Sequence, residues 1–328
     1  TSKVAFGAWV VVVVLLAVPL LYSATASIGP GTVGVGIRPA WRGHTELAVP
    51  PLGTISATTH RAPVALRAEL REVDVLEAMN IARESGALQV TICNTEGAQT
   101  TRVADGTVYT RAGLERGVAS TKCFTASIAA LYVLALGIGV ARGRIDREHL
   151  QGRMNDLARL PEAVARALRD APACQQAARR FATTGHILFL GRGLAFPAAM
   201  EGALKMKEIS YIHAEGYAAG EMKHGPIALI EPDFPTIAIA TRHALRAKMV
   251  SNIEQVQARG GEVTAIVTEG DSQMESLANS IITIPEVPEL LEPVVASVPL
   301  QLLSYYVAVQ RGCDVDQPRN LAKTVTVE

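Results

Sequence analysis

Residues Ile187–Ile209 read ILFLGRGLAFPAAMEGALKMKEI, which places a strand, a turn and a helix in immediate succession. The first four residues form a short apolar run of the kind found in a buried strand. Gly191-Arg192-Gly193 supplies the turn, and we predict a helix over Pro197–Ile209. A strand followed at once by a helix is the building unit of a parallel sheet.

The same alternation extends in both directions from this unit. Further predicted strands are Leu88–Cys93, Thr236–Ala240, Val263–Val267 and Ile281–Ile284. Predicted helices are Val75–Ser85, Ser120–Arg142, Asp146–Ala158, Pro161–Ala182 and Arg246–Arg259, the first and last closed by Gly86 and by Gly260-Gly261. This pattern predicts an α/β fold in which helices cover both faces of a parallel sheet.

Charge and cysteine content exclude several classes of protein. Lysine plus arginine and aspartate plus glutamate each number 31, so there is no basic field for nucleic acid. The four cysteines stand far apart without a C-x-x-C pair, and they are Cys93, Cys123, Cys174 and Cys313. This spacing predicts reduced thiols rather than a zinc site or a disulfide framework. We therefore expect a cytoplasmic protein without nucleic-acid partners, and the lack of a metal-ligand or phosphate-loop motif predicts no cofactor.

The residues before Asp74 differ in composition from the rest. They include both tryptophans but no aspartate, asparagine, glutamine or methionine. Phe6–Tyr22 is a continuous apolar run that ends at Ser23-Ala24-Thr25-Ala26. Three interpretations of the run remain open: a signal peptide, a short membrane anchor and a buried valine-rich strand. Ser27–Pro63 shows neither helical nor strand periodicity, and we predict loop or unstructured chain there.

Charged residues mark one face of the helix that follows the Ile187 strand. Glu201, Lys205 and Glu208 are spaced i, i+4 and i+7, so all three lie on that face. One interpretation is a solvated charge stripe stabilised by weak pairs. The other is a site, because this helix begins at the carboxyl end of a strand, where open α/β sheets bind ligands. A carboxylate beside a lysine there is suited to act as a general base.

Two further polar segments are hard to explain as core. Gly220–Pro226 holds His224 before a Gly-Pro turn, where a histidine is either simply solvated or functional. Asp314–Lys323 is polar and interrupted by proline, and a terminal segment of this kind normally frays.

Several segments together resemble the isomerase half of the glucosamine-6-phosphate synthase family. They are Gly117–Lys122, Ala198–Glu215, Gly220–Pro226, Val298–Gln301 and Asp314–Lys323, and they follow the family's order between about Val75 and Glu328. The resemblance implies two sugar-isomerase (SIS) domains, each a flavodoxin-like parallel sheet between helices. It also implies an aminotransferase that converts fructose 6-phosphate to glucosamine 6-phosphate by ketose-to-aldose isomerisation. The family needs no cofactor for this step.

The resemblance assigns catalytic roles to individual residues. Glu208 would move a proton between C1 and C2 of the sugar, which is the work of a general base. Glu201 and Lys205 would support Glu208. Lys323 would form a Schiff base with the open-chain ketose and so acidify that proton. His224 would assist ring opening from the neighbouring subunit, which implies a homodimer.

The resemblance also assigns the sugar contacts and exposes a gap. Val118, Ser120 and Ala322 would contact the sugar. The family cradles the phosphate with Cys-Gly-Thr-Ser and Ser-Gln-Ser-Gly-Glu-Thr segments at helix N-termini. The first is missing here, and Arg67–Glu72 (RAELRE) stands in place of the second. Its two carboxylates suit a phosphate poorly, although its two arginines offer partial compensation, so we expect an incomplete first domain and weak or absent turnover.

These observations divide the chain into five parts. We expect an aberrant segment over 1–73, the remainder of the first SIS domain over 74–146, a helical linker over 147–178, the second SIS domain over 179–319 and an active-site tail over 320–328. Our hypothesis for Gly7–Val73 is translation of the first SIS half in the wrong reading frame. A genuine membrane or export segment and a divergent domain are the alternatives. On the frame hypothesis the apolar run is accidental, and we expect no membrane association.

The alternatives for function belong to other classes. A sugar-phosphate-binding SIS module without catalysis, an amino-sugar deglycase and an inert misfolded product each fit part of the pattern. The tail from Asp314 favours the synthase over the module and the deglycase. The family's glutaminase domain begins with a cysteine nucleophile, whereas this sequence begins Thr1-Ser2-Lys3, so glutamine hydrolysis is not expected of this polypeptide.

Overall fold

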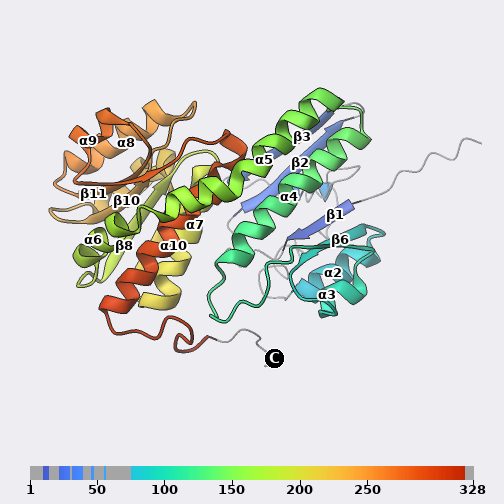
Figure 1. The fold of residues 1–328 in the computed structure, drawn as a ribbon, viewed down its shortest axis with the longest axis horizontal. Coiled ribbons are helices and arrows are strands. Elements are labelled where there is room, and N and C mark those ends of the chain that lie inside the picture. The colour runs from blue at the N-terminus through green and yellow to red at the C-terminus, as the bar shows by residue number, and fades with distance from the viewer. Residues whose placement is uncertain are drawn as a thin grey trace, which may run out of the picture. The chain divides into compact units, whose positions relative to one another are not determined.

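The computed structural model describes the backbone of residues 10–14, 22–29, 32–39, 46–47 and 55–56, and the backbone and side chains of residues 75–321. These residues belong to two compact units, Thr1–Gly113 and Leu114–Glu328, which are treated separately below (Figure 1). The predictions made for Arg67–Glu72, Ala322 and Lys323 fall outside the described residues.

The first unit contains a small parallel sheet of order β1-β6-β7. Its strands are β1 (Val10–Val14), β6 (Leu88–Cys93) and β7 (Gly106–Tyr109), and its helices are α2 (Val75–Glu84) and α3 (Gln99–Val103). The predicted helix and strand on either side of Gly86 are confirmed. Val10–Val14 runs parallel to β6, as the strand interpretation of the apolar run requires.

Two antiparallel pairs complete the described part of this unit. Strands β2 (Tyr22–Gly29) and β3 (Thr32–Pro39) form one pair, and β4 (Glu46–Leu47) and β5 (Ile55–Ser56) form the other. The prediction of loop over Ser27–Pro63 is therefore wrong at the end of β2 and at β3, β4 and β5. Val33, Val35 and Ile37 alternate there with Gly34, Gly36 and Arg38, so a period of two is present in the sequence.

The second unit is built on a parallel sheet of order β12-β11-β10-β8-β9. Its strands are β8 (His186–Gly191), β9 (His213–Ala218), β10 (Pro235–Ile239), β11 (Glu262–Thr268) and β12 (Ser280–Ile284). This is the flavodoxin-like order. The chain first adds β9 on one side of β8 and then adds β10, β11 and β12 on the other side, so the switch point of the sheet lies between β8 and β10. The predicted parallel α/β fold is confirmed, while β9 escaped prediction.

Helices cover both faces of this sheet (Figure 1). They are α5 (Arg147–Leu168), α6 (Ala171–Phe181), α7 (Ala195–Ser210), α8 (Arg246–Gln257), α9 (Ser272–Leu277) and α10 (Glu292–Gln310). Helix α4 (Lys122–Ala141) packs against α5 and α10. Short 3₁₀ turns lie at η1 (Ala219–His224), η2 (Pro226–Leu229) and η3 (Glu289–Leu291). Alternate residues of β8 enter opposite cores: Ile187 and Phe189 pack with α5, α6, α7 and α10, and Leu188 and Leu190 pack with α8 and α9. The strand periodicity of two thus divides the apolar side chains between two helical layers.

One predicted helix boundary is wrong. A break between Ala158 and Pro161 was expected, but α5 continues through Pro161 to Leu168. Leu160 and Ala163 are both buried on the same side of the helix, and this packing offsets the hydrogen bond that a proline cannot donate. The break comes instead before α6 at Asp170, whose carboxylate accepts the backbone N–H of Thr283 at 2.6 Å.

Two helices in the described part of the chain are long and apolar enough to cross a bilayer. They are α4 and the segment Glu289–Gln310, whose most apolar windows are 22% and 67% buried in the fold. Core helices of α/β proteins pass the same test, and α10 is such a helix because it packs between α5, α6 and α7. Length and composition alone are therefore weak evidence for a membrane span.

Candidate active site

Helix α7 brings three predicted catalytic residues together. The Nζ atom of Lys205 lies 3.5 Å from Oε1 of Glu201 and forms a short ion pair with Oε2 of Glu208. The side chains of Lys205 and Glu201 are almost completely buried, whereas that of Glu208 remains 18% exposed. The solvated-stripe interpretation is therefore wrong for the first two. The cluster therefore consists of the buried Lys205 ammonium between two carboxylates, of which Glu201 is buried and Glu208 is partly exposed to solvent.

Burial changes the ionisation of Glu201. Desolvation raises the pKa of its carboxyl to about 7, and the charge of Lys205 opposes this rise. The neighbouring carboxylates Glu208 and Glu115 add to it. The raised pKa favours the neutral form of Glu201, and Glu208 is the nearer carboxylate to the charge of Lys205.

The loop that contains Val118 and Ser120 is fixed at the start of α4. The carboxylate of Glu115 accepts the backbone N–H groups of Thr121 (2.8 Å) and Cys123 (3.2 Å), which caps the helix. Ser120 is only partly exposed and directly precedes this cap. The predicted sugar loop is therefore a rigid turn at a helix N-terminus.

The C-terminal segment is attached to this loop. The backbone N–H of Val118 donates to the carbonyl of Asp316 at 2.9 Å, and a Cβ on Gly117 would lie 3.3 Å from the Asp316 carboxylate. Ala119 packs with Ile209 near the end of α7 in a small apolar cluster that also includes Ala308. The sugar loop, the tail and the end of the α7 helix thus meet in one place. Fraying was expected of the tail from Asp314, yet hydrogen bonds hold it as far as Arg319.

His224 lies apart from the cluster on α7. It ends the turn η1, its side chain is 68% exposed, and its Nε2 atom is 3.8 Å from Oε2 of Glu221. Among the described residues, no hydrogen bond or ion pair connects His224 with Lys205 or Glu208. Its assignment to a neighbouring subunit's site remains a prediction.

The switch point of the sheet holds a polar cluster that sequence reasoning missed. Glu292, at the start of α10, is 5% exposed and accepts a short hydrogen bond from the hydroxyl of Thr241. Burial raises the pKa of its carboxyl. The Nδ1 atom of His243 accepts the N–H of Leu245 at 3.0 Å, which leaves the other ring nitrogen to carry the proton of the neutral form. One feature of the sequence could have indicated this cluster: the polar residues Thr241–His243 directly follow the predicted strand Thr236–Ala240.

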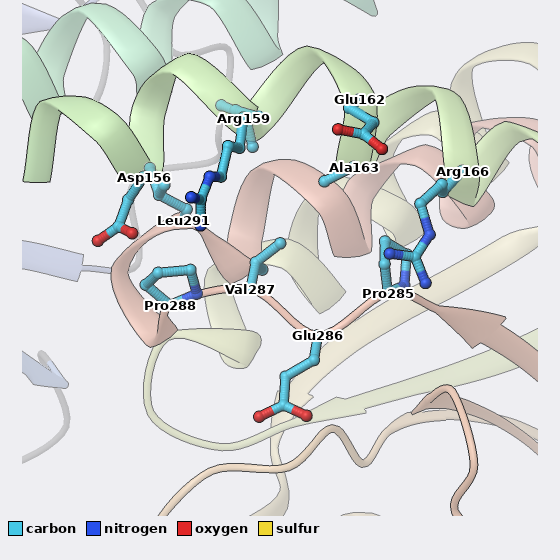
Figure 2. A pocket seen from close by; sticks show the side chains of 11 residues that line it. Asp156, Arg159, Glu162, Ala163, Arg166, Pro285, Glu286, Val287, Pro288 and Leu291 are labelled. Atoms are coloured by element: carbon cyan, nitrogen blue, oxygen red, sulfur yellow. The ribbon is translucent and has the colours of Figure 1, made fainter.

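A separate pocket of about 190 Å³ lies between α5 and the loop that precedes α10 (Figure 2). Figure 2 shows Arg159 and Arg166 extending from α5 toward this loop, while Glu286 points away from the helix. Arg166 is already paired with Glu269. None of the predicted site residues lines this pocket.

Metal and thiol chemistry find little support in the described part of the chain. No group of three or more histidine, cysteine or acidic side chains is placed there to hold a metal ion. All four cysteines are free, and burial raises the pKa of the Cys174 thiol to about 12. That thiol is consequently not available as a nucleophile at neutral pH.

Comparison with known proteins places this fold in a defined class. Residues 180–311 match the family model of the SIS domain. The C-terminal domain of glucosamine-fructose-6-phosphate aminotransferase from Francisella tularensis has a similar structure, with a TM-score of 0.72 and 38% identity over 74% of this chain and 69% of that one. The protein is thus an SIS-domain protein.

Two full-length relatives narrow the assignment. The isomerizing glutamine–fructose-6-phosphate aminotransferases of Thermus thermophilus and Chlorobaculum tepidum are 49% and 50% identical over 78% of this chain. The chain belongs to the family of isomerizing glutamine–fructose-6-phosphate aminotransferases. It matches 42% and 41% of the length of these two relatives.

Proposed function

We propose that this chain carries the isomerase centre of a fructose-6-phosphate aminotransferase, which converts a ketose phosphate to an amino-aldose phosphate. The observation that carries the proposal is the ion pair of buried Lys205 with partly exposed Glu208. A fixed cation holds the carboxylate in one orientation and leaves one end open to a substrate, which suits a general base. The relatives' names supply the substrate, fructose 6-phosphate.

The proposed reaction balances with the groups of this chain. The amine of Lys323 condenses with the C2 carbonyl of the open-chain sugar and releases water, and ammonia then displaces the lysine to leave an imine at C2. Glu208 takes a proton from C1 and returns it to C2. The C1 hydroxyl becomes the aldehyde as its proton passes to the nitrogen. Glu201 and Lys205 hold Glu208 in place throughout.

The remaining assignments concern binding and assembly. Val118, Ser120 and Ala322 would contact the sugar from the loop and the tail. His224 would open the ring in the site of a second copy, which suits its exposed position away from Lys205 and makes the protein a homodimer. The free cysteines suit a reducing compartment, and we place the protein in the cytoplasm.

We further propose that turnover is weak. The segment Arg67–Glu72 replaces the hydroxyl-rich phosphate cradle of the family with two carboxylates. Like charges beside a phosphate reduce its affinity. Ammonia must be supplied in any assay, because the proposal does not include glutamine hydrolysis by this chain.

The test follows hydrogen exchange at C1 of fructose 6-phosphate in heavy water, with and without ammonia, for the full chain and for Glu208→Gln. Deuterium incorporation that depends on Glu208 supports the proposal. Binding of fructose 6-phosphate by calorimetry without any exchange would indicate a sugar-phosphate-binding module instead. If deuterium enters C1 as fast with Glu208→Gln as with the parent protein, Glu208 is not the general base.

A further inference from the structure

The pocket beside helix α5 has no role in the proposed reaction. It lies between α5 and the loop Pro285–Pro288, and all of its lining residues belong to the unit Leu114–Glu328 (Figure 2). We call it the α5 pocket. Its volume of about 190 Å³ is smaller than that of pockets for drug-sized ligands, which occupy about 300–1,000 Å³. The space therefore suits a small metabolite.

The floor of the α5 pocket is apolar and already ordered. Leu160 of α5 and Leu291 of η3 are buried, and Val287 packs against the same apolar core. Pro285 and Pro288 stand at the two ends of the loop, and their fixed φ angles restrict its backbone. The N–H of Leu291 also donates to the carbonyl of Pro288 at 2.8 Å. A ligand would therefore lose little affinity to ordering of the protein.

The rim of the α5 pocket carries an arginine without a partner among the described residues. Arg159 has acidic residues three positions away on both sides, Asp156 and Glu162, and such neighbours on a solvated helix commonly form ion pairs. Within the described part of the chain, however, the Arg159 guanidinium forms no ion pair or hydrogen bond. It extends instead toward the loop at Pro288 (Figure 2). The α5 pocket thus offers a guanidinium that can bind an anionic group.

The other charged residues that line the α5 pocket differ in whether they are paired. Oε2 of Glu286 lies 3.6 Å from Nη1 of Arg242, and this carboxylate points away from α5. Arg166 is already in an ion pair. Asp156 and Glu162, in contrast, make no ion pair or hydrogen bond with any described residue. The groups left for a ligand are therefore one guanidinium and the carboxylates on either side of it, which suits a molecule that carries both charges.

We propose that the α5 pocket binds a small apolar α-amino acid as its zwitterion. The ligand's carboxylate accepts hydrogen bonds from the Arg159 guanidinium, whose planar fork matches a carboxylate. Its ammonium group faces the carboxylate of Glu162, and its apolar side chain covers Val287 and Leu291. A purely anionic ligand would be repelled by Asp156 and Glu162, and a purely cationic one by Arg159. None of the predicted catalytic residues lines this pocket, so the inference does not depend on the proposed function.

The test follows binding of L-leucine to the full chain by NMR of labelled leucine and valine methyl groups. Leu160, Val287 and Leu291 place reporters in the α5 pocket itself. Two analogues separate the charges: 4-methylpentanoate is leucine without the amino group, and 3-methylbutylamine is leucine without the carboxylate. We expect saturable shifts of these methyl groups with leucine, with a dissociation constant of about 1 mM for so small a ligand. Both analogues should bind more weakly.

Variants of the two rim residues test the proposed contacts. Arg159→Gln and Glu162→Gln should each weaken leucine binding about tenfold, the lower end of the range for a hydrogen bond to a charged group, because both side chains are exposed. Glu162→Gln should not weaken binding of 4-methylpentanoate, which has no ammonium group. Arg147→Gln, an exposed arginine of α5 that does not line the pocket, is the matched control and should bind leucine normally. Unfolding midpoints should stay unchanged in all three variants.

Other outcomes overturn the proposal. If leucine causes no saturable shift at Leu160, Val287 and Leu291, the α5 pocket does not bind an apolar amino acid. Equal affinity for leucine and 4-methylpentanoate would make it an anion site instead. Leucine binding that is unchanged in Arg159→Gln would show that this guanidinium does not hold the ligand's carboxylate.

Discussion

The Nζ atom of Lys205 lies 3.5 Å from Oε1 of Glu201, and these side chains are only 2% and 3% exposed. A lysine and a carboxylate one helical turn apart are usually a solvated surface pair. Here α7 packs against α10, and both side chains are buried in the fold, so little water screens the attraction between their charges. Lys205 also holds Glu208 in an ion pair, and the ionisation of Glu201 is coupled to folding because burial raises its pKa.

Replacing Glu201 by glutamine should remove a pH dependence of stability. The pKa of Glu201 is raised from 4.5 to about 7 mainly by burial, so the folded state holds its proton more tightly than the unfolded state. Stability from this group is thus present at low pH and is lost as pH rises from 4.5 to 7. Relative to Glu201→Gln, the parent protein should lose about 1 kcal/mol of unfolding free energy per pH unit in that window and then level off. Urea denaturation of both proteins across the window measures the difference, and a constant difference would contradict it.

Replacing Glu208 by glutamine should abolish proton transfer but keep the fold. The amide cannot act as a base, so C1 exchange should fall by about 10²–10⁴-fold. Affinity for the sugar should change little, because the loop at Val118 and the tail remain. Glu254→Gln, an exposed carboxylate of α8, is the control and should exchange normally. A loss confined to KM, with kcat retained, would assign Glu208 to binding rather than to catalysis.

Sequence periodicity was sufficient to predict how some residues of the candidate site lie relative to one another, but it did not predict the remaining features of the site. It placed Glu201, Lys205 and Glu208 on one face, because the helical repeat alone fixes that relation. It did not show that Glu201 and Lys205 are buried, since burial depends on elements such as α10 that lie far away in the sequence. Edge strand β9 (HAEGYA) was missed because it pairs only with β8 and needs no aliphatic run. The assignment of His224 to an active site came from resemblance alone and stays a prediction.

Mixing two inactive variants should restore activity if His224 acts across subunits. In a heterodimer of Glu208→Gln and His224→Asn, one site has both replacements and the other has neither. Free exchange of subunits should then recover about a quarter of the parent activity. The measurement is C1 exchange in the mixture after dilution and reassembly, with each variant alone as the control. No recovery, from subunits shown to exchange, would place His224 in its own chain's site or outside any site.

Replacing Gly191 by alanine should destabilise the fold, because this glycine lies where β8 meets the start of α7. A Cβ on Gly191 would lie 2.3 Å from the carbonyl oxygen of Ala195 and 2.7 Å from the Cα of Phe196. These are backbone atoms of the helix that carries Lys205, and they cannot move aside as a side chain would. Overpacking of this kind costs about 3 kcal/mol, the upper end of the usual range. The urea midpoint should fall accordingly at an unchanged slope.

Gly185 provides the matched control for this substitution. A Cβ there would meet no heavy atom within 4 Å, and its φ is not in the left-handed region. Gly185→Ala should therefore leave stability unchanged or raise it by about 0.4–1 kcal/mol through the unfolded chain. Equal urea midpoints for the two variants would contradict this prediction, because they would mean that a Cβ at position 191 fits between β8 and the backbone of Ala195. A large loss in Gly191→Ala alone would show that this contact fixes the helix that carries Lys205 and Glu208.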